Sequence, residues 1–206
     1  SISTVARMGE ADGKLISADR NPNSNGAKLI FEQDDPSAKL AAIKAGLGNG
    51  SIKAIVALGE DLIGEAGFSH DELAAAELII STNIKENATA QASDIVLPSS
   101  NFAEKRGTMI NVTGRLQRLN QASQAPGNAR DDWEILRDII LSYTGEANDI
   151  YMLEDIVKVI AQAVPAFEGV TFSKVGDQGI QLIETGVTIP LLEKEKQRVE
   201  NREIVG

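Results

Sequence analysis

The feature that most constrains the fold is an alternation of short apolar runs and helix signals between residues 51 and 98. Three β-branched runs, "SIKAIVALGED", "ELIISTN" and "SDIVLP", have the length and apolar character of buried parallel strands. Between them, Ser69 and Glu72 form a Ser-x-x-Glu capping box, and Lys85 to Ala92 is a stretch of small residues suited to a short helix. Strand and helix therefore alternate, which predicts βαβ units and an α/β fold with a mostly parallel sheet.

Signals upstream of this alternation predict one helix and one loop. Asp35-Pro36 indicates a helix start, because Asp accepts free N–H groups and Pro at the first helical position loses no hydrogen bond. Gly46 is the expected end of that helix, and Asn25-Gly26 is a loop signal.

Downstream, the pattern predicts a pair of strands and then two helices. The strands are Thr108 to Val112 and Arg115 to Leu119, with Thr113-Gly114 as their connection. The first helix ends near Gly145, and the second starts at Asp149 and stops before Pro165. The apolar face expected to pack the first helix consists of Trp133, Leu136, Ile140 and Tyr143.

The composition excludes several classes of function. With 20 Lys and Arg against 30 Asp and Glu, the formal net charge is −10 and no stretch is strongly basic, so nucleic-acid binding is not expected. The chain has no Cys, which excludes disulfides, thiolate nucleophiles and iron–sulfur ligation by its own residues. Its one histidine, His70, provides little material for a catalytic triad or a multi-histidine metal site.

Two further features concern the extent of the chain. No apolar run approaches the roughly 18 residues that a membrane span needs, so direct membrane insertion is not expected. The 206 residues begin without Met and without an obvious first element, and we expect the sequence to be a fragment of a longer polypeptide.

Two glycine-rich stretches are candidates for phosphate sites. The run "GLGNGS" from Gly46 to Ser51 precedes a strand, whereas a dinucleotide fingerprint follows one, so a plain loop is expected. Gly59 and Gly64 have P-loop spacing, but Lys and Ser or Thr do not follow, and the carboxylates of Glu60 and Asp61 would repel a triphosphate. We expect a solvated loop or a subunit contact there.

The remaining candidates are single side chains. His70 is expected to be a neutral surface histidine, and Trp133 a core residue. Arg115 and Arg118 could bind a phosphate bidentately, but pairing with the chain's own Asp and Glu is the favoured interpretation. We therefore assign no catalytic, no cofactor-binding and no metal-ligating residue.

The stretch from Ser93 to Leu136 resembles the molybdopterin oxidoreductase superfamily, and within it most closely the C-terminal part of the large peripheral-arm subunit of NADH-quinone oxidoreductase, respiratory complex I. The resemblance extends from about Ile52 to Gly169, and "ALGED" matches the end of the family's preceding strand. The matching positions are Asp94, Leu97, Pro98, Phe102, Glu104, Lys105, Gly107, Thr108, Asn111, Gly114, Arg115, Gln117, Pro126, Gly127, Asp132 and Trp133.

The chain departs from the family pattern at acidic positions. Ala88, Thr113 and Asn128 stand where the family usually has Glu. The superfamily uses this domain to hold a guanosine half of a pterin dinucleotide, while the complex I subunit generally carries no molybdenum. Loss of these carboxylates is in line with a domain that no longer binds a cofactor.

The resemblance implies a fold and a domain organisation. It implies a Rossmann-like three-layer domain over residues 1–125, starting mid-fold, and a two-helix region packing on it over residues 126–169. An irregular tail of short strands and charged residues is expected over residues 170–206.

The resemblance also implies a function. We expect a non-catalytic structural domain that supports NADH-to-quinone electron transfer by the parent complex. No cofactor is expected in this chain, and iron–sulfur clusters are expected elsewhere in the parent subunit. Its partners would be that subunit and other subunits of the complex, on the cytoplasmic side of the bacterial inner membrane.

Two alternatives stay open. One is a cofactor-binding fragment of a molybdopterin-dependent oxidoreductase such as a formate dehydrogenase. The other is a free-standing Rossmann-like nucleotide binder, which the misplaced glycine clusters disfavour.

Overall fold

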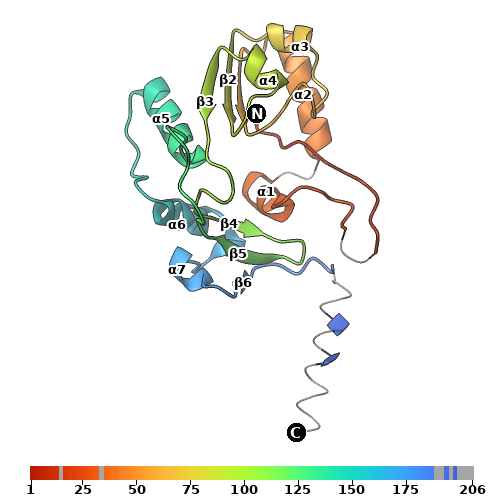
Figure 1. The fold of residues 1–206 in the computed structure, drawn as a ribbon, viewed down its shortest axis with the longest axis vertical. Helices are drawn as coiled ribbons and strands as arrows, with labels where there is room; N and C mark the ends of the chain where they lie inside the picture. The colour runs from red at the N-terminus through yellow and green to blue at the C-terminus, as the bar shows by residue number, and fades with distance from the viewer. Residues whose placement is uncertain (14–15, 33–34, 188–192, 195–196, 199–206) are drawn as a thin grey trace.

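The structure, a computed structural model, describes residues 1–13, 16–32, 35–187, 193–194 and 197–198 (Figure 1). One lobe of the described part holds a parallel sheet with α2, α3 and α4. The other holds an antiparallel sheet with α6 and α7 (Figure 1). α1 lies between these two groups, and α5 lies beside β3 in this view.

The parallel sheet has the predicted strands in the order β1-β2-β3. They are β1 (Ala54–Leu58), β2 (Leu78–Asn83) and β3 (Ile95–Pro98). The register places Val56 beside Ile80, and Ile80 beside Ile95. The α/β class with a parallel sheet is confirmed.

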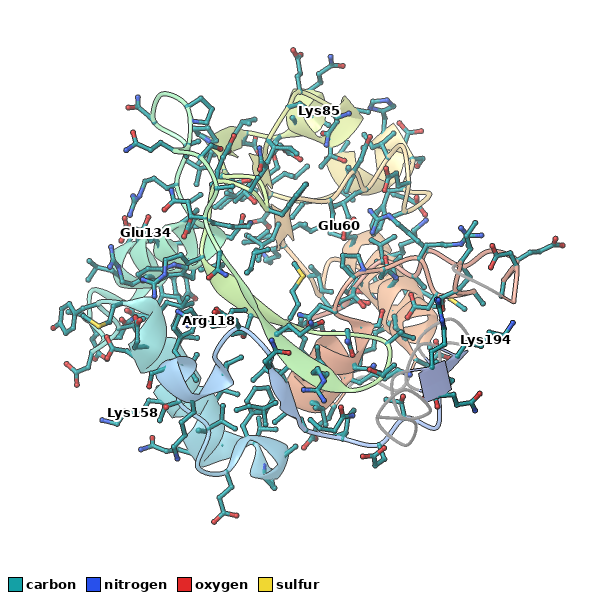
Figure 2. The ribbon with its side chains drawn as sticks, turned by 60° about the horizontal axis from the view of Figure 1, so that its bottom comes forward. Glu60, Lys85, Arg118, Glu134, Lys158 and Lys194 are labelled. Carbon is teal, nitrogen blue, oxygen red and sulfur yellow. The ribbon has the colours of Figure 1, made fainter. Side chains whose placement is uncertain are left out.

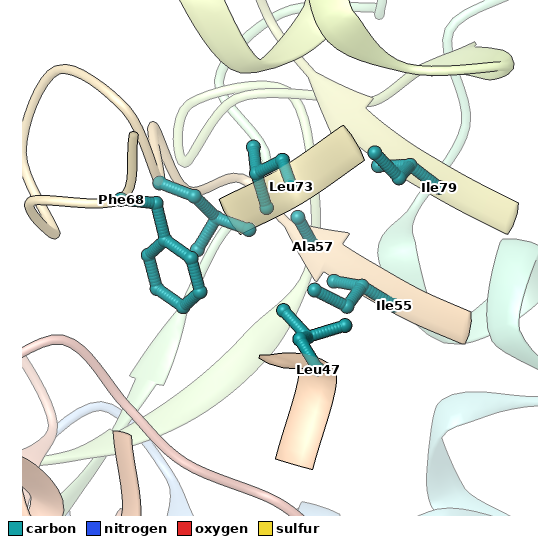
Figure 3. Packing of buried hydrophobic residues seen from close by; sticks show 7 residues of the cluster. Leu47, Ile55, Ala57, Phe68, Leu73 and Ile79 are labelled. Atoms are coloured by element: carbon teal, nitrogen blue, oxygen red, sulfur yellow. The ribbon is translucent and has the colours of Figure 1, made fainter. Parts of the chain in front are cut away.

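Helices cover one face of this sheet. They are α2 (Pro36–Gly48), α3 (His70–Ala74) and α4 (Ala88–Ala92). Figure 3 shows the core that α2 and α3 form with β1, β2 and the loop after β1, in which Leu47 and Leu73 are at most 1% exposed. Because this burial removes apolar surface from water, it is the main force that holds the layers together. The labelled members are Leu47, Ile55, Ala57, Phe68, Leu73 and Ile79.

The other face of the sheet is more open. Alternation along β1 turns Ile55 and Ala57 inward, and leaves Val56 at 43% and Leu58 at 38% exposure. Ile95, on the same face, is 43% exposed. This apolar face contrasts with the usual burial of parallel strands on both sides.

The predicted helix ends in this lobe are partly confirmed. Asp35 caps α2, with its carboxylate accepting from the Ala38 N–H at 3.0 Å, and Ser69 and Glu72 form the capping box of α3. The prediction that α2 ends at Gly46 was wrong, because the helix continues to Gly48. Gly46 lies against Ile52, and a Cβ there would come within 2.7 Å of the isoleucine side chain, so close packing explains this glycine.

The second sheet is antiparallel and includes the predicted pair of strands. It consists of β4 (Gly107–Ile110), β5 (Arg115–Leu119) and β6 (Ile180–Gln181) in that order. A second apolar core lies against this sheet, with Ile110 and Leu116 each 2% exposed. Its other buried members are Val157, Phe167, Val170, Phe172 and Val175.

The expected loop at Asn25-Gly26 is wrong, since these residues lie in α1 (Ser24–Phe31). Asn23 precedes the helix with φ 66°, and its side-chain oxygen accepts from the N–H of Ile110 at 2.7 Å. Asn25 donates to the Asn111 carbonyl at 2.8 Å. Docking on β4 therefore decides the local conformation.

The two C-terminal helices are present, but the predicted start of the second at Asp149 was wrong, because it begins at Leu153 after the N-cap residue Met152. They are α5 (Asp132–Thr144) and α6 (Leu153–Ala163), followed by a 3-10 turn (Pro165–Phe167) and by α7 (Phe172–Val175). Ile135 is the buried residue of α5, whereas Ile140 is 47% and Tyr143 is 91% exposed. The C-terminal half of the face predicted to be core is thus open to solvent, whereas Trp133 and Leu136 in its N-terminal half are half-buried.

Part of the predicted charged tail lies outside the described residues, namely 188–192, 195–196 and 199–206. The domain boundaries at residues 125 and 169 stay a prediction.

Candidate functional site

The candidate site lies at the carboxyl ends of the parallel strands, because ligands of open α/β sheets bind there. We use the name carboxyl edge for the residues at or just after the ends of the three strands and for the groups that bond to them. These residues are Gly59, Glu60, Asp61, Thr82, Asn83, Ser99, Ser100, Lys105, Asp131 and Asp132.

A connected chain of polar contacts crosses the centre of this edge. The hydroxyl of Thr82, 0% exposed at the end of β2, donates to Asp132 Oδ1 at 3.0 Å and accepts from the Gly59 N–H at 3.1 Å. The other carboxylate oxygen of Asp132 pairs with Lys105 Nζ at 2.6 Å. These contacts join β1, β2, the segment before β4 and the first turn of α5.

Contacts after β3 join the same helix to the sheet. The buried Ser100 hydroxyl donates to Asp131 Oδ1 at 2.5 Å, and its backbone N–H donates to the Arg130 carbonyl at 2.9 Å. The start of α5 is therefore tied to two strand ends.

The loop after β1 carries the carboxylates that the sequence singled out. Glu60 pairs with Arg7 at 2.6 Å, and the same guanidinium also contacts Glu65. The hydrogen bond to Glu60 raises the pKa of Arg7, because the carboxylate stabilises the charged guanidinium. The pair connects the N-terminal segment to the carboxyl edge.

Asp61 organises its own loop. Its Oδ1 accepts from the Gly64 N–H at 3.0 Å and from the Thr89 hydroxyl at 2.9 Å. The Gly64 N–H, followed by the Thr89 contacts, lowers the pKa of Asp61, because these donors stabilise the carboxylate. Thr89 is 0% exposed, so this contact links the loop to α4.

The pyrophosphate of a pterin dinucleotide needs hydrogen-bond donors that have no other partner. The donors of the carboxyl edge can therefore be compared with this requirement. The charged donors Arg7 and Lys105 are paired with carboxylates, and the Gly59 N–H is bonded to Thr82. Asn83 Nδ2 is buried without a partner in the described part of the chain, but it is a single neutral donor. The carboxyl edge, with its several carboxylates, does not fit a pyrophosphate group.

Other candidates from the sequence lie apart from this edge. His70 is exposed at the start of α3, as predicted. Trp133 is half-buried rather than core, with the Arg137 guanidinium 5.6 Å from its ring centre. Among the described residues, no group of three or more His, Cys, Asp or Glu could hold a metal ion.

The two arginines of β5 do not pair with carboxylates of the described residues, so that prediction was wrong. Arg115 donates to the backbone carbonyls of Gln178 and Gly179, at 3.1 and 3.3 Å. Arg118 lies over the Phe172 ring, 4.6 Å from its centre.

Sequence reasoning missed the network around Thr82. Lys105 and Asp132 stand out in the sequence only as positions of resemblance, and their contact spans 27 residues of chain. Thr82 belongs to no recognisable motif. Its one signal in the sequence is that it is a polar residue at the end of an apolar run.

Comparison with known proteins places the chain in a family. A family profile for molybdopterin oxidoreductase matches residues 6–141, which is more than half of the chain. The chain belongs to the molybdopterin oxidoreductase family.

Relatives within this family have different stated roles. The F420-dependent formate dehydrogenase alpha subunit of Methanocaldococcus jannaschii is 30% identical over 191 residues, covering 89% of this chain and 26% of that protein. The F420-dependent formate dehydrogenase 1 alpha subunit of Methanococcus maripaludis is 33% identical over 133 residues, or 63% of this chain and 20% of the relative. The mitochondrial NADH-ubiquinone oxidoreductase 78 kDa subunit of Neurospora crassa is 33% identical over 136 residues, which cover 65% of this chain and 16% of that protein.

The chain spans about a quarter or less of the length of these three relatives. No helix in the part of the chain that the structure describes is long and apolar enough to cross a bilayer.

Proposed function

We propose that this chain is a non-catalytic structural domain of the large peripheral-arm subunit of an NADH-quinone oxidoreductase. In this proposal it packs against the cluster-bearing parts of its parent subunit and against neighbouring subunits. It lies peripherally on the cytoplasmic side of the bacterial inner membrane and supports electron transfer without binding a cofactor.

The observation that carries this proposal is the internal pairing of the carboxyl edge. Lys105 and Arg7, the cations that could meet a phosphate there, are held by Asp132 and Glu60 at 2.6 Å each. A pyrophosphate would have to break these pairs and lie beside their carboxylates, which is electrostatically unfavourable. The same contacts fasten four segments of chain together, as a structural junction requires.

A second candidate is the cofactor-binding domain of a molybdopterin-dependent formate dehydrogenase. The observation that favours it is the 30% identity to the Methanocaldococcus jannaschii subunit, which extends over 89% of this chain. In that case the residues of the carboxyl edge would bind the guanosine half of the cofactor after rearrangement of the Lys105–Asp132 pair.

Metal analysis of the intact parent oxidoreductase separates the two candidates. We expect no stoichiometric molybdenum in the purified complex, and no heat of binding when GDP is titrated into the chain. One molybdenum per parent subunit, or saturable GDP binding abolished by Lys105→Met, would favour the molybdopterin-dependent type of function instead.

The Lys105→Met substitution tests the junction directly. Lys105 and Asp132 are 24% and 29% exposed, so loss of the pair should lower the free energy of unfolding by about 1–3 kcal/mol. Lys53→Met is the matched control, because Lys53 pairs with Glu77 at 2.7 Å but both side chains are about two-thirds exposed, and it should cost under about 1 kcal/mol.

The readout that separates structure from catalysis is taken in the parent complex. Lys105→Met should reduce the amount of assembled complex while the turnover of each assembled complex stays unchanged. A lower turnover with normal assembly would contradict a purely structural role.

A further inference from the structure

A cavity of about 620 Å³ lies away from the carboxyl edge, between the end of β5, α6 and the segment that leads into α7. The side chains that matter for its chemistry are Arg106, Arg118, Glu154, Asp155, Lys158 and Phe172. Figure 2 shows Arg118 and Lys158 on this side of the molecule, far from the labelled Lys85. The volume is in the range of small-molecule sites, which is about 300–1,000 Å³.

Arg118 lies in the cavity wall and makes no side-chain hydrogen bond or ion pair with another described residue. Its guanidinium carbon lies 4.6 Å from the centre of the Phe172 ring, and Phe172 is only 3% exposed. Its Nε atom is buried and has no hydrogen-bond partner in the described part of the chain. Because this atom is buried, a ligand in the cavity would contact the terminal nitrogens of the guanidinium, which also have no hydrogen-bond partner among the described residues.

The other charged groups of the cavity leave a positive excess. Arg106 also lies over Phe172, at 4.9 Å, but it pairs with Glu154 at 3.0 Å. Asp155 is engaged by the backbone N–H groups of Tyr151 and Met152, at 2.9 and 3.0 Å. Both carboxylates thus have partners, and the uncommitted charges are positive.

Lys158 is the second uncommitted cation. It projects from α6 as an exposed side chain and makes no hydrogen bond or ion pair with another residue that the structure describes. Together with Arg118 it brings two positive charges to one cavity. A phosphate dianion matches both charges, whereas a single carboxylate would leave one of them unpaired.

We propose that this cavity binds the phosphate group of a small molecule through Arg118 and Lys158. The stacked Arg118 guanidinium provides a fixed fork of N–H donors, since ring stacking limits its rotation before the ligand arrives. Lys158 closes the other side as a flexible point charge. The proposal is independent of the carboxyl edge and of the structural role proposed above.

Calorimetric titration of the chain in about 0.15 M NaCl tests this, because such salt screens non-specific surface attraction beyond about 8 Å. The probes are inorganic phosphate and ribose 5-phosphate. Saturable binding of either probe is the expected result. Equal affinities would identify free phosphate as the ligand, and tighter binding of ribose 5-phosphate would identify a phosphate ester.

Charge-removing substitutions assign the binding to the cavity. Arg118→Met should weaken the affinity by about tenfold or more, and Lys158→Met by about threefold to tenfold. Lys85→Met removes the same charge at a distant exposed site and should leave the affinity unchanged. Thermal unfolding checks that each variant is folded.

Two results would overturn the proposal. One is the absence of saturable binding of both probes to the unmodified chain, as expected if the cavity takes only a carboxylate from a neighbouring polypeptide. The other is an unchanged affinity in Lys158→Met, which decides the matter even if Arg118→Met fails to fold.

Discussion

At the scale of single residues, Gly114 is held against the backbone of Ile183. It has φ +84°, and a Cβ at this position would come within 2.1 Å of the Ile183 carbonyl oxygen. The Ile183 segment cannot easily move away, because the N–H groups of Leu182 and Ile183 donate to the Gly114 carbonyl oxygen at 3.1 and 3.4 Å. Only glycine satisfies both the conformation and the space.

We therefore expect Gly114→Ala to lower the free energy of unfolding by about 3 kcal/mol, as the sum of left-handed strain and overpacking. Gly127→Ala is the matched control. Gly127 has φ +56° with nothing within 4 Å of its Cβ position, so it should cost only the strain of about 1–2 kcal/mol. Equal losses in denaturant titrations would contradict the steric argument.

Asp61 predicts a pH dependence at the same scale. Its folded pKa is lowered by the Gly64 N–H and the Thr89 contacts, whereas an unfolded Asp titrates near about 3.9. The carboxylate therefore contributes stability that is present above about pH 5 and is lost as the pH falls through about 3.9 towards the lower folded pKa.

The comparison of Asp61→Asn with the unmodified chain isolates this group from the other carboxylates. Asparagine keeps an acceptor but not the charge, so we expect a loss of about 1 kcal/mol at pH 7. This difference should shrink as urea titrations are repeated from about pH 5 down to about pH 3. A difference that stays constant over that interval would rule out the titration of Asp61 as its source.

At the scale of elements, the docking of α1 on β4 depends on Asn23. Its side-chain oxygen accepts from the N–H of Ile110, a residue that is 2% exposed, so no water can readily replace the contact. Asn23 also has φ 66°, a conformation that asparagine tolerates better than most residues. One residue thus joins a helix start to a strand.

Asn23→Gly separates these two roles, because glycine accepts the positive φ but offers no acceptor. We expect it to destabilise the chain by about 1–3 kcal/mol, the cost of leaving a buried donor unsatisfied. Asn23→Asp keeps an acceptor in place and is the control, with an expected loss that is clearly smaller. Hydrogen exchange at Ile110 measures the effect locally, and unchanged protection in Asn23→Gly would contradict it.

At the scale of the whole molecule, helices cover one face of the parallel sheet except at Val96 of the edge strand β3, which is 47% exposed, and the other face is open. Val56, Leu58 and Ile95 on the open face are each between 38% and 43% exposed. Contiguous exposed apolar side chains of this kind bind hydrophobic dyes.

We expect the chain to enhance the fluorescence of the dye ANS, and the double substitution Val56→Thr/Ile95→Thr to reduce that enhancement at least about twofold. Threonine keeps the β-branched shape, so the strands should be retained. Ile55→Thr on the covered face is the contrasting variant, since it should lower stability instead. Equal dye binding by the double variant would exclude this face as the binding surface.

The sequence by itself determined the elements that rest on local chemistry. Alternating β-branched runs predicted β1, β2 and β3, and the side chains of Asp35 and Ser69 predicted the starts of α2 and α3. These signals are readable because each depends on residues only a few positions apart. The family could also be recognised, since its motif positions lie within one continuous stretch.

The tertiary structure alone decided the contacts between distant segments. The Thr82–Asp132–Lys105 network joins residues up to 50 positions apart, and the Asn23–Ile110 contact joins residues 87 positions apart. The same holds for the wrong predictions, in which Asn25 became helical on β4 and the face with Tyr143 turned to solvent. Local spacing carries no information on which distant surface a helix will meet, so only the folded chain could set these contacts.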